Sequence, residues 1–232
     1  MLELKNITLA AVSSVNLQQT RKALEYSCRG IRFGDVLLLS HKKPWRTPDW
    51  IRFEPIEPMT DILAYNRMIL YELWKYIRTD YVLINHYDGF VVHPELWDDR
   101  YLEYDYIGAP WPAEDCPAER IDEQGRICRV GNGVSLRSRR LLEFMEREQI
   151  PFEPYEGTYS GDVLLCVKYR SRLEEQGIRI APVELAAGFS HENDIAEWDG
   201  TRDTFMFHEW SGTNRRYPRF LSARLLDKTL KI

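Results

Sequence analysis

The run Tyr81-Val82-Leu83-Ile84-Asn85-His86-Tyr87-Asp88-Gly89 decides how this chain is expected to fold. Its first four residues are apolar, which is typical of a strand that is covered on both faces. Polar side chains and a glycine follow at once, so the strand ends in a turn that presents His86 and Asp88. Ligands of parallel sheets bind beyond the carboxyl ends of the strands, and this turn is therefore the first candidate for a functional site.

Strand and helix patterns alternate on both sides of this run. Apolar β-rich segments predict strands at 7–12, 35–40 and 104–108, and helical spacing predicts helices at 17–31, 62–77, 138–147 and 162–176. The Pro-rich stretch 44–58 predicts a loop with one edge strand, and Thr60 is the expected N-cap of the next helix. The alternation predicts an α/β fold with a mostly parallel central sheet flanked by helices. No repeat or linker interrupts it, so residues 1–232 are expected to form one domain.

Composition excludes several classes of protein. Of the 232 residues, 44% are hydrophobic and 29% are charged, and no apolar run approaches the ~18 residues that a membrane span needs. The start shows no secretory signal, so a cytoplasmic location is expected. A net charge of −5 without a long basic run disfavours nucleic acid as a partner. The four cysteines form no CxxC pair, which predicts free thiols.

Further motifs carry side chains that suit binding or catalysis. Tyr65-Asn66-Arg67 offers a ring for base stacking and a guanidinium for phosphate, although both side chains also suit an ordinary helix surface. Gly131-Asn132-Gly133-Val134-Ser135 matches no nucleotide-binding fingerprint and fits either a turn or a flat wall beside a ligand. Asp162 opens a helix, where an acid is common without any function. His208 follows an apolar run, as buried structural histidines often do.

In their order along the chain, these motifs resemble those of metal-dependent glycosyltransferases with the GT-A fold. Tyr65-Asn66-Arg67 is similar to the Phe-Asn-Arg motif with which inverting galactosyltransferases contact uridine diphosphate, and His86-Tyr87-Asp88 stands where they have DxD. The segment 131–135 is similar to their Gly-Gly-Val-Ser wall of the sugar site. Gly161-Asp162 stands where they have Glu-Asp, whose Asp is the catalytic base, and His208 matches a late metal-binding histidine.

Four runs, 65–74, 81–97, 104–112 and 130–140, more closely resemble a bacterial glycosyltransferase-like family of unknown function. Three departures from the galactosyltransferase motifs affect the expected roles of site residues. His86 replaces the first Asp of DxD, which leaves the metal-binding carboxylate to Asp88. Asn132 replaces a glycine, and Gly161 replaces the Glu that would bind the acceptor, so the acceptor stays undefined.

The resemblance implies a GT-A-like (nucleotide-diphospho-sugar transferase) fold, with a nucleotide-binding half of about residues 1–110 and an acceptor-binding half of about residues 111–232. It implies an enzyme of polysaccharide biosynthesis that moves a sugar from a nucleotide-diphosphate donor, expected to be a UDP-sugar, to a hydroxyl of a glycan or glycolipid. Inversion at the anomeric carbon is expected, and retention stays open because the base is inferred from position. Peripheral contact with the inner face of the membrane is compatible with such an acceptor.

Each site residue then has an expected role. Asp88 and His208 hold Mn²⁺ or Mg²⁺, which neutralises the diphosphate leaving group, and Asp162 accepts the proton of the acceptor hydroxyl. The nucleotide is expected at Ser13, Ser14, Tyr65, Arg67 and Asp88, and the sugars at Trp111, Asn132 and Gly133.

Two other functions fit part of the pattern. His86-x-Asp88 with His208 spells the facial triad of iron(II)/2-oxoglutarate oxygenases, and Arg215, Arg216 or Arg219 would then bind oxoglutarate. That chemistry belongs to a double-stranded β-helix, which the alternating pattern does not predict. A non-catalytic carbohydrate-binding domain fits the 7 Trp and 13 Tyr, but it has no need of Asp88, Asp162 and His208 together.

Overall fold

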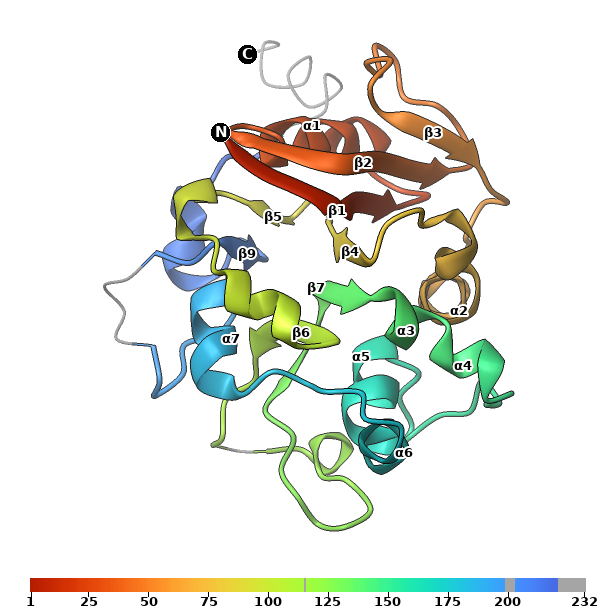
Figure 1. Cartoon of the computed structure of the whole chain (residues 1–232), viewed down its shortest axis with the longest axis vertical. Coiled ribbons are helices and arrows are strands. Elements are labelled where there is room, and N and C mark those ends of the chain that lie inside the picture. Colours follow the sequence, from red (N-terminus) through yellow and green to blue (C-terminus); the bar gives the residue numbers. More distant parts are fainter. Residues whose placement is uncertain (115, 199–202, 221–232) are drawn as a thin grey trace, which may run out of the picture.

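The computed structural model describes residues 1–114, 116–198 and 203–220. Its main sheet has six strands in the order β3-β2-β1-β4-β7-β6 (Figure 1). β1 is parallel to β2 and β4, and β2 is parallel to β3, whereas β7 is antiparallel to both of its neighbours. These strands are β1 Leu2–Val12, β2 Ile31–Ser40, β3 Arg52–Pro55, β4 Tyr81–Ile84, β6 Tyr106–Pro110 and β7 Val130–Ser138. The mostly parallel central sheet is confirmed.

A second, three-stranded sheet joins segments that are far apart in the sequence. Its order is β5-β9-β8, with β5 Gly89–Val91, β8 Ser190–His191 and β9 Met206–His208. β5 and β9 pair antiparallel, so that Gly89 lies opposite His208. The pairing therefore carries His208 to the turn that follows β4.

The helices lie near their expected positions, except α7, which was not predicted. They are α1 Leu17–Ser27, α2 Ile62–Arg67, α3 Arg139–Leu142, α4 Phe144–Arg147, α5 Gly161–Val163, α6 Arg170–Glu175 and α7 Val183–Phe189. Wide helical turns at 68–72 and 164–168 continue α2 and α5, and short 3₁₀ turns lie at 73–76, 94–96, 99–103, 118–120 and 212–216. The expectation of a Thr60 cap was wrong by one residue, because the carboxylate of Asp61 accepts the Ala64 N–H at 2.8 Å.

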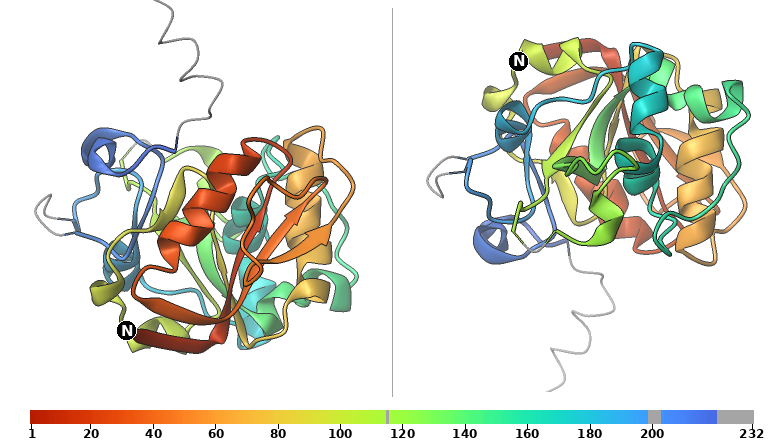
Figure 2. Two further views of the ribbon diagram at one scale, coloured as in Figure 1. Left: turned by 90° about the horizontal axis from the view of Figure 1, so that it is seen from above. Right: turned by 90° about the horizontal axis from the view of Figure 1, so that it is seen from below.

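Helices cover both faces of the main sheet (Figure 2). Successive β1 side chains point to opposite faces: Leu9 packs in one core cluster with Leu24 of α1, and Ala10 packs in another with Ile69. Ile69 follows α2, so α1 and α2 lie on opposite faces. Among the described residues, no helix is long and apolar enough to cross a bilayer.

β7 is the main element that the sequence did not predict. Residues 131–135 suggested a turn or a wall, and they form part of a strand between β4 and β6. Glycine and asparagine are poor strand formers, which hid the strand. Gly131 is nevertheless required, since a Cβ there would lie 2.0 Å from the ring of Trp111.

Asp105 links β7 and its following helix to the segment before β6. Its carboxylate accepts hydrogen bonds from the Ser138 hydroxyl at 2.6 Å, from Arg140 Nη2 at 2.6 Å and from the Arg179 N–H at 2.8 Å. Burial acts to raise the pKa of Asp105, but these hydrogen bonds outweigh it and hold the pKa below its usual value. The ionised carboxylate therefore stabilises the folded chain.

We expect Asp105→Ala to lower the free energy of unfolding by about 2–3 kcal/mol at neutral pH, because three buried or part-buried donors lose their acceptor. The depressed pKa makes this contribution complete above the unfolded pKa of about 4, and it is lost as the pH falls through the lower folded value. Urea unfolding at several pH values checks this. The exposed Asp80 gives the control Asp80→Ala, which should change stability by about 0.5 kcal/mol or less. Equal losses in both variants would contradict the assignment.

Candidate active site

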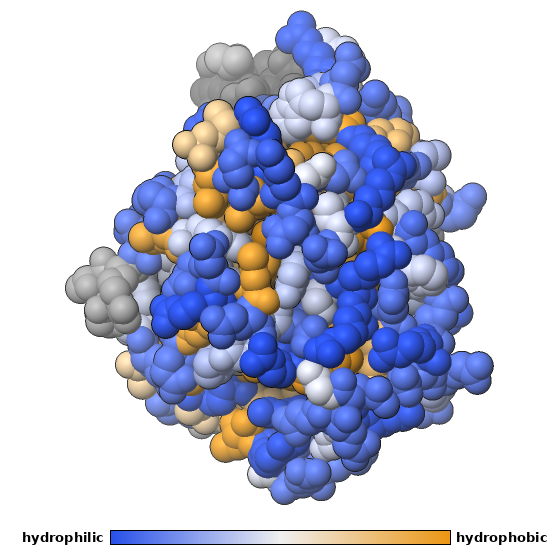
Figure 3. Space-filling model, viewed as in Figure 1, coloured by the Kyte–Doolittle hydropathy of each residue, from blue (hydrophilic) through white to orange (hydrophobic). Residues whose placement is uncertain are grey.

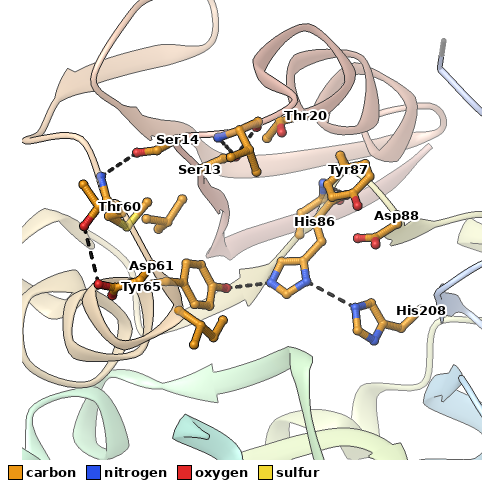
Figure 4. A pocket seen from close by; sticks show the side chains of 15 residues that line it. Ser13, Ser14, Thr20, Thr60, Asp61, Tyr65, His86, Tyr87, Asp88 and His208 are labelled. Atoms are coloured by element: carbon orange, nitrogen blue, oxygen red, sulfur yellow. Dashed lines mark hydrogen bonds between the residues drawn. The ribbon is translucent and has the colours of Figure 1, made fainter. Parts of the chain in front are cut away.

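A cavity of about 420 Å³ opens beyond the carboxyl ends of β1 and β4 (Figure 4). The strand order reverses at β1, and ligands of open α/β sheets bind at this switch point. Ser14 Oγ accepts the Met59 N–H at 2.8 Å, which ties the segment after β1 to the start of α2. The lining residues are Val12, Ser13, Ser14, Val15, Thr20, Met59, Thr60, Asp61, Ile62, Tyr65, Asn85, His86, Tyr87, Asp88 and His208. The cavity thus has an apolar side and a polar end.

A second cavity, of about 490 Å³, adjoins the first. Both are lined by Ile62, Tyr65, His86 and His208, so the two histidines lie where the cavities meet. The other residues of the second cavity are Leu63, Asn66, Trp111, Asn132, Gly133, Gly157, Thr158, Tyr159, Ser160, Asp162 and Glu192. All of the predicted nucleotide residues except Arg67 line the first cavity, and the predicted sugar residues line the second.

His86, Asp88 and His208 form a cluster at this junction. One ligand atom of each lies within 4.8 Å of the others. His86 Nδ1 is 3.3 Å from His208 Nε2, and the opposite nitrogen of His86 contacts the Tyr65 hydroxyl at 2.6 Å (Figure 4). His208 Nδ1 is buried, makes no hydrogen bond among the described residues, and lies 3.5 Å from Glu192 Oε1. Tyr65 and Glu192 therefore lie beside the outer nitrogens of the two rings. The inner nitrogens, His86 Nδ1 and His208 Nε2, face each other.

The two histidines differ in their protonation. Burial, with the nearby charges of His208 and Arg137, lowers the pKa of His86 to about 3, so its ring is neutral. Burial also acts to lower the pKa of His208, but the carboxylates of Glu192 and Asp88 outweigh it and raise that pKa. Two nitrogens and one carboxylate around one point fit a divalent metal ion, whose binding would compete with protonation of His208.

Asn132 connects the two carboxylates of the second cavity. Its backbone N–H donates to Asp162 Oδ2 at 2.7 Å, and its side-chain amide donates to Glu192. The Ser160 hydroxyl donates to the other oxygen of Asp162. None of these hydrogen bonds joins the Asp162 carboxylate to the N–H groups at the start of its own helix. The carboxylate instead contacts Asn132 and Ser160, which line the second cavity. Asp162 and Glu192 are thereby held on the same cavity.

The backbone of Asn132 has a φ of 106°, a conformation that favours glycine. A glycine, which the similar Gly-Gly-Val-Ser motif has at the matching position, would adopt this conformation without strain. Here Asn132 Oδ1 accepts the Val134 N–H at 2.9 Å, so the side chain stabilises the backbone in which it sits. Strained backbone conformations of this kind are common at functional sites.

Two predicted residues are placed differently from expectation. Arg67 is exposed, lines neither cavity, and lies 5.9 Å from the ring centre of Tyr71. Its helix turns it away from the site, so the expected contact with the diphosphate has no support in this structure. Trp111 lines the second cavity but is only 5% exposed, packed against Gly131 and Val163. Sugar stacking on Trp111 stays a prediction, with little ring surface to carry it.

Two residues of the site were not predicted from the sequence for the role that the structure indicates. His86 was assigned to the cluster only under the oxygenase alternative, although its substitution for Asp in the DxD-like turn was the available sign. Glu192 was missed altogether, since it belongs to no motif and comes to Asn132 and His208 only through the β8 and β9 pairing.

Comparison with known proteins identifies the family and the fold. Residues 50–208 match the family described as "Protein of unknown function (DUF5672)", and the chain belongs to it. No protein of curated function matches. The galactosyltransferase LgtC, solved in complex with donor and acceptor sugar analogues, is similar with a TM-score of 0.51 and 15% identity over 89% of this chain and 87% of that chain. A structure of an active-site mutant of LgtC gives a TM-score of 0.50 and 13% identity over 96% and 94%. The chain therefore has the GT-A glycosyltransferase fold.

The strain at Asn132 gives a stability prediction. Asn132→Gly and Asn132→Ala both lose the side-chain hydrogen bonds, but only alanine keeps a Cβ at positive φ. We expect the alanine variant to be less stable than the glycine variant by about 1 kcal/mol in chemical denaturation. Glu175, which is exposed in α6, gives the control. There the alanine variant should be more stable than the glycine variant, because alanine favours a helix. A glycine variant that is the less stable at both positions would contradict the strain.

Proposed function

We propose that this protein is a metal-dependent glycosyltransferase. It transfers a sugar from a nucleotide-diphosphate donor, UDP-sugar by preference, to a hydroxyl of a glycan or lipid-linked glycan. The observation that carries the proposal is the junction of the two cavities, where His86, Asp88 and His208 cluster between predicted nucleotide residues and a pocket with two carboxylates. A donor that spans both cavities has its diphosphate at this cluster.

The donor site uses residues 1–110 together with His208 and Glu192, which β9 and β8 bring to it. The apolar side of the first cavity, with Val12 and Met59, suits a nucleobase, and the hydroxyls of Ser13 and Ser14 suit the ribose. Asp88, His208 and also His86 hold Mn²⁺ or Mg²⁺, with Tyr65 and Glu192 as outer partners of the two rings. The bound ion supplies positive charge that stabilises the diphosphate as it leaves.

The acceptor half uses residues 111–232. Asp162 accepts the proton of the attacking hydroxyl, for which its carboxylate has lone pairs beyond the two bonds from Asn132 and Ser160. Gly133 keeps the wall flat, since a Cβ there would lie 2.9 Å from His86 Cε1. Attack from the face opposite the diphosphate inverts the anomeric carbon. A cytoplasmic enzyme of polysaccharide biosynthesis fits this reaction.

The oxygenase alternative is not supported by the fold. The histidine and aspartate cluster forms, but it lies on an open, mostly parallel α/β sheet and not in a double-stranded β-helix. The arginines expected to bind oxoglutarate line neither cavity: Arg216 pairs with Asp203, and Arg219 lies over Trp210. A non-catalytic sugar-binding domain remains the rival, and the variants below separate it from the enzyme.

Asp88→Asn should weaken Mn²⁺-dependent binding of UDP by about 100-fold or more, because the cluster loses its only carboxylate ligand while the side-chain shape is kept. Titration calorimetry with UDP, with and without Mn²⁺, measures this. The matched control is Asp61→Asn, which lines the same cavity and retains its capping of α2. If Asp88→Asn binds UDP and Mn²⁺ as the parent does, the metal assignment is wrong.

Asp162→Asn should slow sugar transfer by roughly 10²–10⁴-fold, the usual effect of losing a general base, with UDP–Mn²⁺ affinity almost unchanged. UDP release from a panel of UDP-sugars, with glycan acceptors present, gives the rate. Glu192→Gln is the comparison, since that carboxylate lines the same cavity. A larger loss of transfer rate in Glu192→Gln than in Asp162→Asn, with UDP–Mn²⁺ affinity unchanged, would indicate that Glu192 is the general base. Unchanged turnover in both would favour the non-catalytic rival.

A further inference from the structure

Two of the exposed apolar side chains are tryptophans of a single loop. In the described structure, eight large hydrophobic residues are exposed: Met1, Val15, Trp45, Trp50, Ile62, Leu63, Leu96 and Ile127. Val15 and Ile62 line the first cavity, and Leu63 lines the second, whereas the two tryptophans line neither. The face seen in Figure 3 is largely hydrophilic with small, scattered apolar patches.

The two tryptophans belong to the loop 41–51 between β2 and β3, which leaves β2 at its carboxyl end (Figure 1). Trp45 is 70% exposed and Trp50 is 53% exposed, so packing in the core does not account for either. The loop itself is well anchored. Pro44 and Ile51 are buried, and Arg21 of α1 donates to the Arg46 carbonyl at 3.4 Å. A fixed loop therefore presents two indoles to the outside.

The same loop is basic in a chain of net charge −5. Lys42, Lys43 and Arg46 are all exposed, against one exposed acid, Asp49. The Arg46 guanidinium lies 4.2 Å from the ring centre of Trp45, so cation and indole are presented together. Tryptophan beside lysine and arginine is the combination that binds the interfacial layer of a bilayer with anionic headgroups.

We propose that the loop 41–51 docks this protein on an anionic lipid surface. The indoles of Trp45 and Trp50 enter the headgroup layer, and Lys42, Lys43 and Arg46 attract the negative headgroups. Docking of this kind does not depend on catalysis and is tested without it.

Flotation of the full chain with vesicles tests the proposal. The chain should bind vesicles of mixed phosphatidylglycerol and phosphatidylcholine, bind phosphatidylcholine vesicles much more weakly, and be released by salt. Trp45→Ala/Trp50→Ala should weaken binding at least about tenfold. Lys42→Gln/Lys43→Gln should weaken it by roughly 25-fold, at about fivefold for each cation near an anionic surface.

Two control pairs match these changes elsewhere on the surface. Leu96→Ala/Ile127→Ala removes the same kind of exposed apolar area, and Arg147→Gln/Arg172→Gln removes the same charge from α4 and α6. Both should bind vesicles like the parent. Absent or charge-independent vesicle binding would overturn the proposal, as would equal losses in the loop and control pairs. Binding of a single-stranded oligonucleotide in place of vesicles, lost in the loop variants, would overturn it in favour of nucleic acid.

Discussion

The pairing of Gly89 with His208 is the contact on which the site depends. It joins the turn after β4 to a strand 119 residues further on, and it does so without room for a side chain. A Cβ on Gly89 would lie 2.5 Å from Val134 Cγ2 and 2.7 Å from His208 Cδ2. Because glycine lets β5 come this close, His208 reaches His86 and Asp88, and Glu192 follows through β8. One close approach between strands thus assembles groups from three parts of the chain.

The arrangement also separates two kinds of chemistry. The first cavity has an apolar side and the metal-ligand cluster at its end, whereas the second has the carboxylates of Asp162 and Glu192 with Asn132 between them. Tyr65 and the histidines lie at the boundary. The apolar side of the first cavity and the carboxylates of the second therefore adjoin the same cluster.

The sequence predicted the parts of this structure that depend on local patterns. The apolar run at 81–84 and the helical spacing at 62–77 lead to the correct elements, and Asp88 and Ser13, which were predicted for one site, line the same cavity. It did not predict the strand β7, because the glycines that allow Trp111 and His86 to pack closely also lower strand propensity. It did not indicate that Arg67 is exposed away from the cavities, since a motif gives the order of residues but not the face of the helix on which they lie. Glu192 required the tertiary pairing, which no local pattern encodes.

We expect one metal-bound nucleotide diphosphate to bind where the two cavities meet. A crystal of the full chain grown with UDP and Mn²⁺, with data collected at the manganese absorption edge, tests this directly. An anomalous peak should appear among His86, Asp88 and His208, with the nucleotide in the first cavity. An anomalous peak elsewhere, or a nucleotide bound away from this cluster, would contradict it.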